Sequence, residues 1–240
     1  MSLLKNWFRQ STDSASFARY IALGDSISTD DYPGEGKGAA SLFYRNQDHL
    51  YPDYRGKDLF ALNREIEFLS LAEDGATSRD VLHSQLPELG NGSRDRTVIT
   101  LTAGGNDILS HQADAEEVMF RIRTIVDRLQ QIYPQSEIIL GTIYDPSDGV
   151  GDLFGKEVMD KELRTAYAIN DGIRRMAQPP AIRVAEIHKH FLGHGAHCKD
   201  PSNPYFHPED PSLWYVLTIE PNSRGAQEIR SVFWRALHAR

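Results

Sequence analysis

The stretch "YIALGDSIST", residues 20–29, is an apolar run that ends abruptly in Gly24-Asp25-Ser26. A short, nearly continuous apolar run is typical of a strand that is covered on both faces of a parallel sheet. The hydroxyl of Ser26 is therefore expected where that strand stops. A serine in this place often caps a following helix, but it can also act as a nucleophile at the edge of the sheet. The rest of the chain decides between these two interpretations.

Further short apolar runs follow, and segments with helical periodicity separate them. The runs cover residues 66–71, 97–102, 137–144 and 182–187. Residues 114–133 are the clearest helical segment, because their apolar side chains recur at three- and four-residue spacing. Residues 156–177 and 223–240 repeat this pattern. Strands that alternate with helices indicate one α/β domain with a doubly wound parallel sheet. We expect this domain to span residues 19–240, after an N-terminal extension of residues 1–18.

The composition argues against several classes of partner. The formal net charge of -8 disfavours nucleic acid and anionic membrane surfaces, because both are bound mainly through Lys and Arg. The single cysteine, Cys198, rules out an internal disulfide. No run approaches the ~20 apolar residues that span a bilayer, and residues 1–16 lack the long apolar core of a secretory signal. These features predict a cytoplasmic protein without nucleic-acid or membrane partners, and they leave its oligomeric state open.

Groups with catalytic potential follow each of the first three predicted strands. Ser26 follows the first, Gly75 in "LAEDGATSRD" the second, and Asn106 in "LTAGGNDIL" the third. The carboxyl ends of parallel strands meet at one edge of the sheet, where open α/β proteins bind their ligands. A hydroxyl, an unobstructed glycine N–H and an Asn amide are the parts of a nucleophile with an oxyanion hole. Three long irregular segments are expected at the same edge, as the rim of a substrate site; they are residues 30–57, 145–155 and 188–222.

In order and spacing, these blocks resemble those of a known family, the SGNH hydrolases, also called GDSL esterases and lipases. The blocks are Gly24-Asp25-Ser26, the glycine of "AEDGATS", and Gly104-Gly105-Asn106-Asp107. The resemblance extends from about Tyr20 to the C-terminus. It implies a flavodoxin-like three-layer α/β/α sandwich with a five-stranded parallel sheet of order 2-1-3-4-5. It also implies that Ser26 is the nucleophile, and that the Ser26 N–H, the Gly75 N–H and the Asn106 side chain form the oxyanion hole.

The fourth block of the family is altered in this chain. The family pattern is Asp-x-x-His, followed by Pro, a polar residue and a downstream Gly, and the stretch here is "YVLTIEPNSRGAQEI". Pro221, Asn222 and Gly225 match the flanking positions. Glu220, however, occupies the position of the histidine, and Leu217 that of the aspartate. The general base and the carboxylate that orients it are therefore both missing from their expected places.

Three interpretations of this departure are open. In the first, Glu220 is the base, which requires that burial raises its pKa above the ordinary ~4.3. In the second, a histidine from the preceding loop is the base. The candidates are His207 in "PYFHPEDP", with Glu209 or Asp210 close by to orient it, and His194 or His197. In the third, the site is impaired, and the protein binds acylated or glycosylated ligands without turning them over.

The sequence thus predicts a serine esterase or acylhydrolase that acts on a short-chain acyl ester or a carbohydrate O-acyl ester through a Ser26 acyl-enzyme. The alternative is a non-catalytic binding protein on the same fold. No cofactor is expected, and no metal, because the histidine-rich run "IHKHFLGHGAHC" at 187–198 fits no standard zinc spacing. Loop aromatics such as Tyr32, Tyr205 and Trp214 either stack on the substrate or pack the loops together.

Overall fold

The structure is a computed structural model that describes residues 16–111, 113–153, 156–157 and 160–239. Most of the predicted N-terminal extension, residues 1–15, lies outside the described residues. Phe17 is buried, and the guanidinium of Arg96 lies over its ring at 4.5 Å. The N–H of Ala18 donates to the carbonyl of Arg96 at 2.8 Å. Packing of the domain therefore includes residue 17, just before the predicted boundary.

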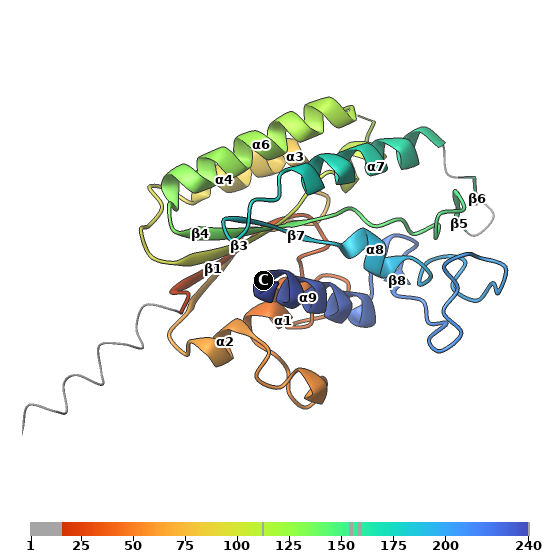
Figure 1. The fold of residues 1–240 in the computed structure, drawn as a ribbon, viewed down its shortest axis with the longest axis horizontal. Coiled ribbons are helices and arrows are strands. Elements are labelled where there is room, and N and C mark those ends of the chain that lie inside the picture. The colour runs from red at the N-terminus through yellow and green to blue at the C-terminus, as the bar shows by residue number, and fades with distance from the viewer. Residues whose placement is uncertain (1–15, 112, 154–155, 158–159, 240) are drawn as a thin grey trace, which may run out of the picture.

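The centre of the molecule is a five-stranded parallel sheet (Figure 1). Its strands, in spatial order, are β2 (Glu67–Ser70), β1 (Arg19–Gly24), β3 (Thr97–Thr102), β4 (Ser136–Gly141) and β7 (Ile182–Ala185). The predicted order 2-1-3-4-5 is confirmed, because β5 (Asp152–Leu153) and β6 (Lys156–Glu157) pair with each other in a separate hairpin. Gly24 at the end of β1 is in register with Thr102 at the end of β3. The segments that follow these two strands consequently leave the sheet side by side.

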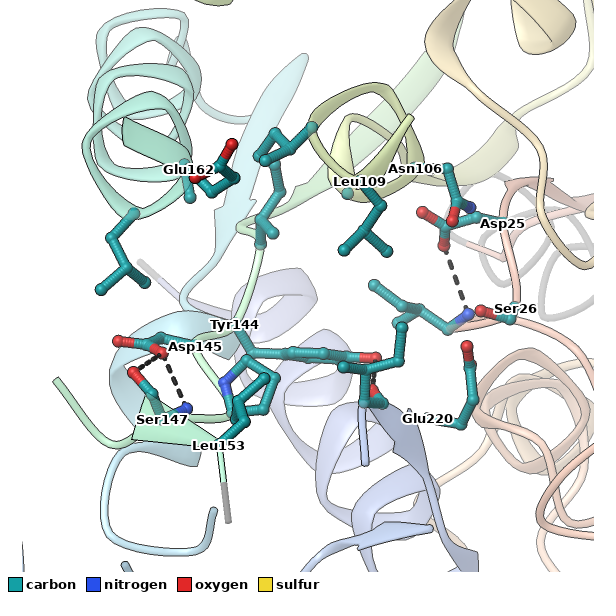
Figure 2. A pocket seen from close by; sticks show the side chains of 18 residues that line it. Asp25, Ser26, Asn106, Leu109, Tyr144, Asp145, Ser147, Leu153, Glu162 and Glu220 are labelled. Carbon is teal, nitrogen blue, oxygen red and sulfur yellow. Dashed lines mark hydrogen bonds between the residues drawn. The ribbon is translucent and has the colours of Figure 1, made fainter. Parts of the chain in front are cut away.

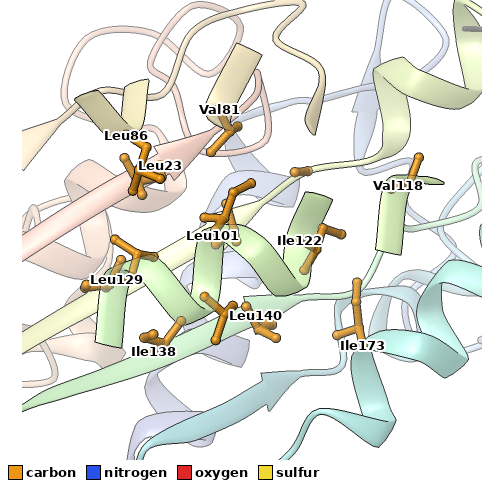
Figure 3. Packing of buried hydrophobic residues seen from close by; sticks show 14 of the residues in the cluster. Leu23, Val81, Leu86, Leu101, Val118, Ile122, Leu129, Ile138, Leu140 and Ile173 are labelled. Atoms are coloured by element: carbon orange, nitrogen blue, oxygen red, sulfur yellow. The ribbon is translucent and has the colours of Figure 1, made fainter. Parts of the chain in front are cut away.

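Helices cover both faces of the sheet, which confirms the predicted three layers (Figure 1). On one face lie α6 (Ala115–Ile132) and α7 (Asp160–Arg175), and on the other lie α1 (Ala39–Tyr44) and α9 (Ser223–His238). Successive residues of a strand point to opposite faces. Ile21 and Leu23 accordingly belong to the core under α6 and α7, which Figure 3 shows, whereas Tyr20 and Ala22 belong to the core under α1 and α9.

Shorter elements complete the fold. They are the helices α2 (Leu59–Leu62), α3 (Ser78–Asp80), α4 (Leu86–Glu88), α5 (Gly105–Leu109) and α8 (Ile187–Phe191), the 3-10 helix η1 (Pro52–Tyr54), the π-helix η2 (Val81–Gln85), and the hairpin strands β8 (Tyr215–Val216) and β9 (Glu220–Pro221). Several of them lie inside the three segments predicted as irregular. Helix α1 forms within residues 30–57 because Leu42 and Phe43 are buried against the core under α9.

Strand β4 ends at Gly141, before the predicted end at residue 144. The side chain of Asn170 on α7 accepts a hydrogen bond from the Ile143 N–H at 2.7 Å and donates one to the Ile143 carbonyl at 2.8 Å. The backbone groups of Ile143 therefore bond to a helix side chain and not to a neighbouring strand. As a result, Ile143 and Tyr144 leave the sheet and become part of a cavity wall.

Candidate active site

Ser26 lies in a tight turn directly after β1. The carboxylate of Asp25 accepts a hydrogen bond from the Ile27 N–H at 3.2 Å, and the carbonyl of Asp25 accepts one from the Ser28 N–H at 3.1 Å. The turn is also tied to β3, because the hydroxyls of Ser28 and Thr102 are 3.0 Å apart. Ser26 itself is 5% exposed. The turn thus holds its side chain at the edge of the sheet with little freedom to move.

The interpretation of Ser26 as a helix cap is wrong. Residues 25–30 form turns and bends, and the next helix, α1, begins at Ala39 with Gly38 as its N-cap. The turn instead depends on Gly24, which has φ +129°. A Cβ at this position would lie 2.0 Å from the carbonyl oxygen of Thr102, so only glycine lets β1 and β3 approach here.

The two predicted oxyanion donors are neighbours of each other. Asn106 is in the first turn of α5, and its Nδ2 donates to the carbonyl of Ala76 at 3.0 Å. An amide NH₂ carries two hydrogens, so one remains for a ligand. Gly75, directly before Ala76, has φ +76°, and in the described part of the chain no acceptor is bonded to its N–H. The segment after β2 is therefore joined to the segment after β3, with a donor left on each.

A buried carboxylate fixes this arrangement. Asp107 is fully buried and accepts hydrogen bonds from the N–H and the hydroxyl of Ser78, both at 2.7 Å. Arg121 on α6 compensates its charge at 3.1 Å. Because Asp107 follows Asn106 and Ser78 follows the Gly75 segment, this pair locks the two donors together. The sequence reasoning included Asp107 in the third block without giving it this role.

Glu220 reaches the site on the β8–β9 hairpin. The hydroxyl of Tyr144 donates to the carbonyl of Ile219 at 2.7 Å, and this bond holds the hairpin against the cavity wall. Figure 2 shows the Glu220 carboxylate turned toward Ser26. Within the described chain no hydrogen bond of standard geometry is formed between the two side chains, and the Oε2 atom of Glu220 is buried without a donor. Catalytic hydrogen bonds are often poorly aligned before substrate binds.

Burial changes the acidity of two carboxyl groups beside Ser26. Desolvation raises the pKa of Glu220 above its ordinary value, the neighbouring hydroxyl of Ser26 lowers it in part, and the charge of Asp74 raises it further. Desolvation raises the pKa of Asp25 from 3.8 to about 7, although hydrogen bonds from Thr102 and Ile27 oppose the rise. Both groups are thus better proton acceptors than ordinary carboxylates near neutral pH.

Ser26, Asn106 and Glu220 line one cavity of about 120 Å³ (Figure 2). Its walls are largely apolar and include Ile108, Leu109, Ile143, Leu163 and Ala166. Gly75 is not part of its lining and lies beside it, next to Asn106. The structure therefore brings together a hydroxyl, a carboxylate and an amide donor at the mouth of an apolar space. This set can activate a nucleophile and stabilise an oxyanion.

The histidine alternatives lie elsewhere. His207 donates through Nε2 to the carbonyl of Leu192 at 3.2 Å, and its ring stacks on that of His194 at 5.0 Å. His194 stacks in turn on the buried Trp214 at 3.5 Å, and His197 bonds to the carbonyl of Asp152 at 3.1 Å. None of the three histidines is among the described residues that line the cavity. These rings pack the 192–214 loop, so the structure does not bring His207 to Ser26.

Two further features bear on the predicted absences. Among the described residues, no three His, Cys, Asp or Glu side chains are grouped so that they could hold a metal ion. In the same part of the chain, none of the helices has the length and the apolar character that crossing a bilayer requires.

Comparison with known proteins places the chain in a family. The model of the GDSL-like lipase/acylhydrolase family matches residues 22–211. The chain belongs to this family. No curated protein matches the sequence.

Among solved structures, a lipolytic G-D-S-L family member from Veillonella parvula is similar, with a TM-score of 0.65 and 16% identity over 92% of this chain and 99% of that chain. Axe2, an acetylxylan esterase from Geobacillus stearothermophilus, has a TM-score of 0.63 and 16% identity over 94% and 96% of the two chains. A phospholipase A1 from Streptomyces albidoflavus has a TM-score of 0.54 and 20% identity over 92% and 100%.

The family match and the altered block occupy different parts of the chain. The GDSL-like match includes Ser26, Gly75 and Asn106 but ends before Leu217 and Glu220. At these identities the solved structures share the fold of this GDSL-like protein, and two of them, a phospholipase A1 and an acetylxylan esterase, are named for different esters. The comparisons therefore do not identify the reaction, and its chemistry is inferred from the residues beside Ser26.

Proposed function

We propose that this GDSL-like protein is a serine esterase that hydrolyses carboxylic esters through an acyl-enzyme on Ser26, with Glu220 as the general base. The observation that carries the proposal is the desolvated Glu220 carboxylate facing the Ser26 hydroxyl at the mouth of the cavity. A serine hydroxyl is a weak nucleophile until a neighbouring base takes its proton. Among the described residues that line the cavity beside Ser26, the basic groups are carboxylates.

The reaction follows from these positions. Glu220 takes the proton of Ser26 as Oγ attacks the ester carbonyl, and the negative charge moves to the carbonyl oxygen. The Ser26 N–H, the Gly75 N–H and the second hydrogen of Asn106 Nδ2 stabilise that oxyanion. Protonated Glu220 then gives its proton to the leaving alcohol, and the acyl group remains on Ser26. Water, activated by Glu220 in the same way, releases the carboxylic acid.

The substrate is a small ester with a short acyl chain. The cavity of about 120 Å³ is small, and it is lined largely by apolar side chains. This favours a short alkanoyl group in the largely apolar space over a long fatty acyl chain. Trp214, one of the loop aromatics considered for sugar stacking, is 3% exposed and packs on Phe191 and His194, which favours the packing interpretation.

A binding protein on the same fold is the second candidate, and one observation favours it. Leu217, at the position where the family has an aspartate, is 72% exposed and contributes no charge to the site. The usual His-Asp pair therefore has no counterpart at these two positions. In this case the cavity would hold an acylated ligand, and Ser26 would be unreactive.

The test is covalent labelling combined with hydrolysis of p-nitrophenyl butyrate. Wild-type protein is incubated with a fluorophosphonate from pH 5 to pH 9, and the adduct is located by mass spectrometry. We expect labelling at Ser26, its loss in Ser26→Ala, and a fall of about 10²–10⁴-fold in the hydrolysis rate of Glu220→Gln, the usual contribution of a positioned base. His207→Ala is the matched control and should retain the wild-type rate.

Each result separates the candidates. A folded wild-type protein that is unlabelled at every pH, and that hydrolyses no ester, would favour the binding protein. Loss of rate in His207→Ala, with full activity in Glu220→Gln, would transfer the base to the histidine loop.

In addition to the function, a cytoplasmic location and the absence of nucleic-acid and membrane partners remain our proposals from the charge and composition of the chain.

A further inference from the structure

The far end of the cavity differs in character from the end that holds Ser26. Figure 2 shows Ser26, Asp25, Asn106 and Glu220 at one end, and Asp145, Ser147 and Glu162 at the other. Apolar side chains, including that of Leu109, lie between the two ends (Figure 2). Of the described lining residues, none is Lys, Arg or His. A substrate chain that extends from Ser26 through the apolar middle consequently arrives at two carboxylates.

Asp145 is a buried carboxylate with hydrogen bonds to both of its oxygens. It is 1% exposed, and its oxygens accept hydrogen bonds from the N–H and the hydroxyl of Ser147 at 2.8 and 2.5 Å, from the Gly149 N–H at 3.0 Å, and from the Tyr167 hydroxyl at 3.0 Å. With its hydrogen bonds already made, Asp145 acts on a ligand mainly through its electric field.

Glu162 has capacity left for a ligand. Its side chain is 14% exposed, and one oxygen, Oε1, lies 3.2 Å from Nδ1 of His111. The other oxygen, Oε2, is shielded from solvent and has no hydrogen-bond partner in the described part of the chain. On its outer side Glu162 borders a surface groove that also contains Asp114, Glu117 and Lys161. A buried carboxylate oxygen without a donor is costly, so it calls for a specific reason.

We infer that the cavity selects esters whose acyl chain ends in a hydrogen-bond donor, a primary ammonium group above all, and that Glu162 determines this preference. The inference rests on the proposed esterase function. An ammonium group at the end of the chain supplies the donor that Glu162 Oε2 lacks, in the field of Asp145. An anionic chain end brings a third carboxylate to the same place, and none of the described residues that line the cavity is Lys, Arg or His. A methyl end neither satisfies Oε2 nor repels it.

Three ethyl esters of one chain length test the preference. They are ethyl 6-aminohexanoate, ethyl hexanoate and monoethyl adipate, whose six-carbon acyl chains end in CH₂NH₃⁺, CH₃ and COO⁻. Release of ethanol gives kcat/KM for each at pH 7. We expect the amino ester to exceed the adipate by about 10–100-fold, with hexanoate between them, since a charge-assisted hydrogen bond typically contributes on this scale.

Glu162→Gln should bring the ratio of the amino ester to hexanoate close to one, because the amide has no charge. The matched control is Asp171→Asn on the same helix, whose side chain is 61% exposed and pairs with Arg174. This variant removes the same charge outside the cavity and should keep the wild-type ratio. Thermal melts of both variants establish that they are folded, and the three wild-type values do not depend on any variant.

The outcomes distinguish the inference from the function on which it rests. Hydrolysis of all three esters at similar kcat/KM by the wild-type protein would overturn the inference and leave the esterase intact. A preference for the amino ester that persists in Glu162→Gln would overturn the role of Glu162. Failure of the wild-type protein to hydrolyse any of the three would overturn the proposed esterase and the inference with it.

Discussion

Replacing Asp25 by Asn should make the protein more stable at alkaline pH. Asp25 is 2% exposed, and desolvation raises its pKa from 3.8 to about 7. A group whose pKa is raised on folding contributes stability that is fully present below its unfolded pKa and is lost as the pH rises through its folded pKa. For Asp25 the loss therefore runs from about pH 4 to about pH 7. Asn does not titrate, and its Oδ1 can still accept the hydrogen bond that the Ile27 N–H donates to Asp25.

The size of the effect follows from the two pKa values. At 1.36 kcal/mol for each pKa unit, the difference between 3.8 and about 7 corresponds to a total loss of about 4 kcal/mol in the free energy of unfolding. About 2–3 kcal/mol of this falls between pH 5 and pH 8, because the unfolded chain has already lost its proton at pH 5 while the folded chain loses it near pH 7. Relative to the wild type, the free energy of unfolding of Asp25→Asn should therefore increase by about 2–3 kcal/mol between pH 5 and pH 8.

Urea denaturation, followed by far-UV circular dichroism, measures the difference in the free energy of unfolding between Asp25→Asn and the wild type at pH 5 and at pH 8. Asp171→Asn is the control, because it makes the same substitution at a carboxylate that is 61% exposed. If the difference between Asp25→Asn and the wild type is the same at both pH values, Asp25 is charged at pH 5 in the folded protein. Burial beside Ser26 would then not raise the pKa of this carboxyl group.

Three further substitutions test the geometry around Ser26. Asn106→Ala should lower kcat for p-nitrophenyl butyrate by about 10²–10³-fold with little change in KM, because it removes one oxyanion donor; an unchanged kcat would exclude Asn106 from the oxyanion hole. Gly24→Ala should destabilise the fold by more than about 3 kcal/mol in urea, since its Cβ would lie 2.0 Å from the Thr102 carbonyl oxygen; a wild-type midpoint would contradict the close approach of β1 and β3. Leu217→Asn should raise the melting temperature through a gain of about 0.5–1 kcal/mol, because Leu217 is 72% exposed with φ 48° and Asn tolerates this conformation better; a lower melting temperature would show that the leucine side chain contributes to the hairpin.

The sheet and its helices could be predicted from the sequence because their signals are local. The apolar run at Tyr20–Leu23 and the stripe on residues 114–133 each reflect one element packed on one core. The end of β4 could not be predicted in this way. It depends on Asn170, on a helix 27 residues further along the chain, which takes the backbone bonds of Ile143.

The same distinction between local signals and contacts of distant segments applies to the candidate site. Ser26 and Asn106 follow strands directly, so their positions could be derived from the topology. The choice between Glu220 and His207 depends on how the 192–214 loop folds, and there the rings of His194 and His207 stack in series on Trp214. The acidic far end of the cavity had no sequence signal at all. Asp145 comes from the segment after β4 and Glu162 from α7, and no motif connects them.

The two departures in the fourth block are physically consistent with each other. A histidine base becomes a cation when it takes the serine proton, and the aspartate of the usual pair stabilises that cation. A glutamate base becomes neutral in the same step, while its negative charge passes through Ser26 to the oxyanion. The base then needs no counter-ion, and a second carboxylate beside Glu220 would repel it and raise its pKa further. Leu217 has no charge and adds no such repulsion. Restoring only the histidine at position 220 would therefore create an imidazolium without a partner at Leu217, and restoring only the aspartate would place two like charges on one hairpin.

Glu220→His should consequently be less active than Glu220→His combined with Leu217→Asp. Equal rates for the two variants on p-nitrophenyl butyrate would show that the two positions do not act together.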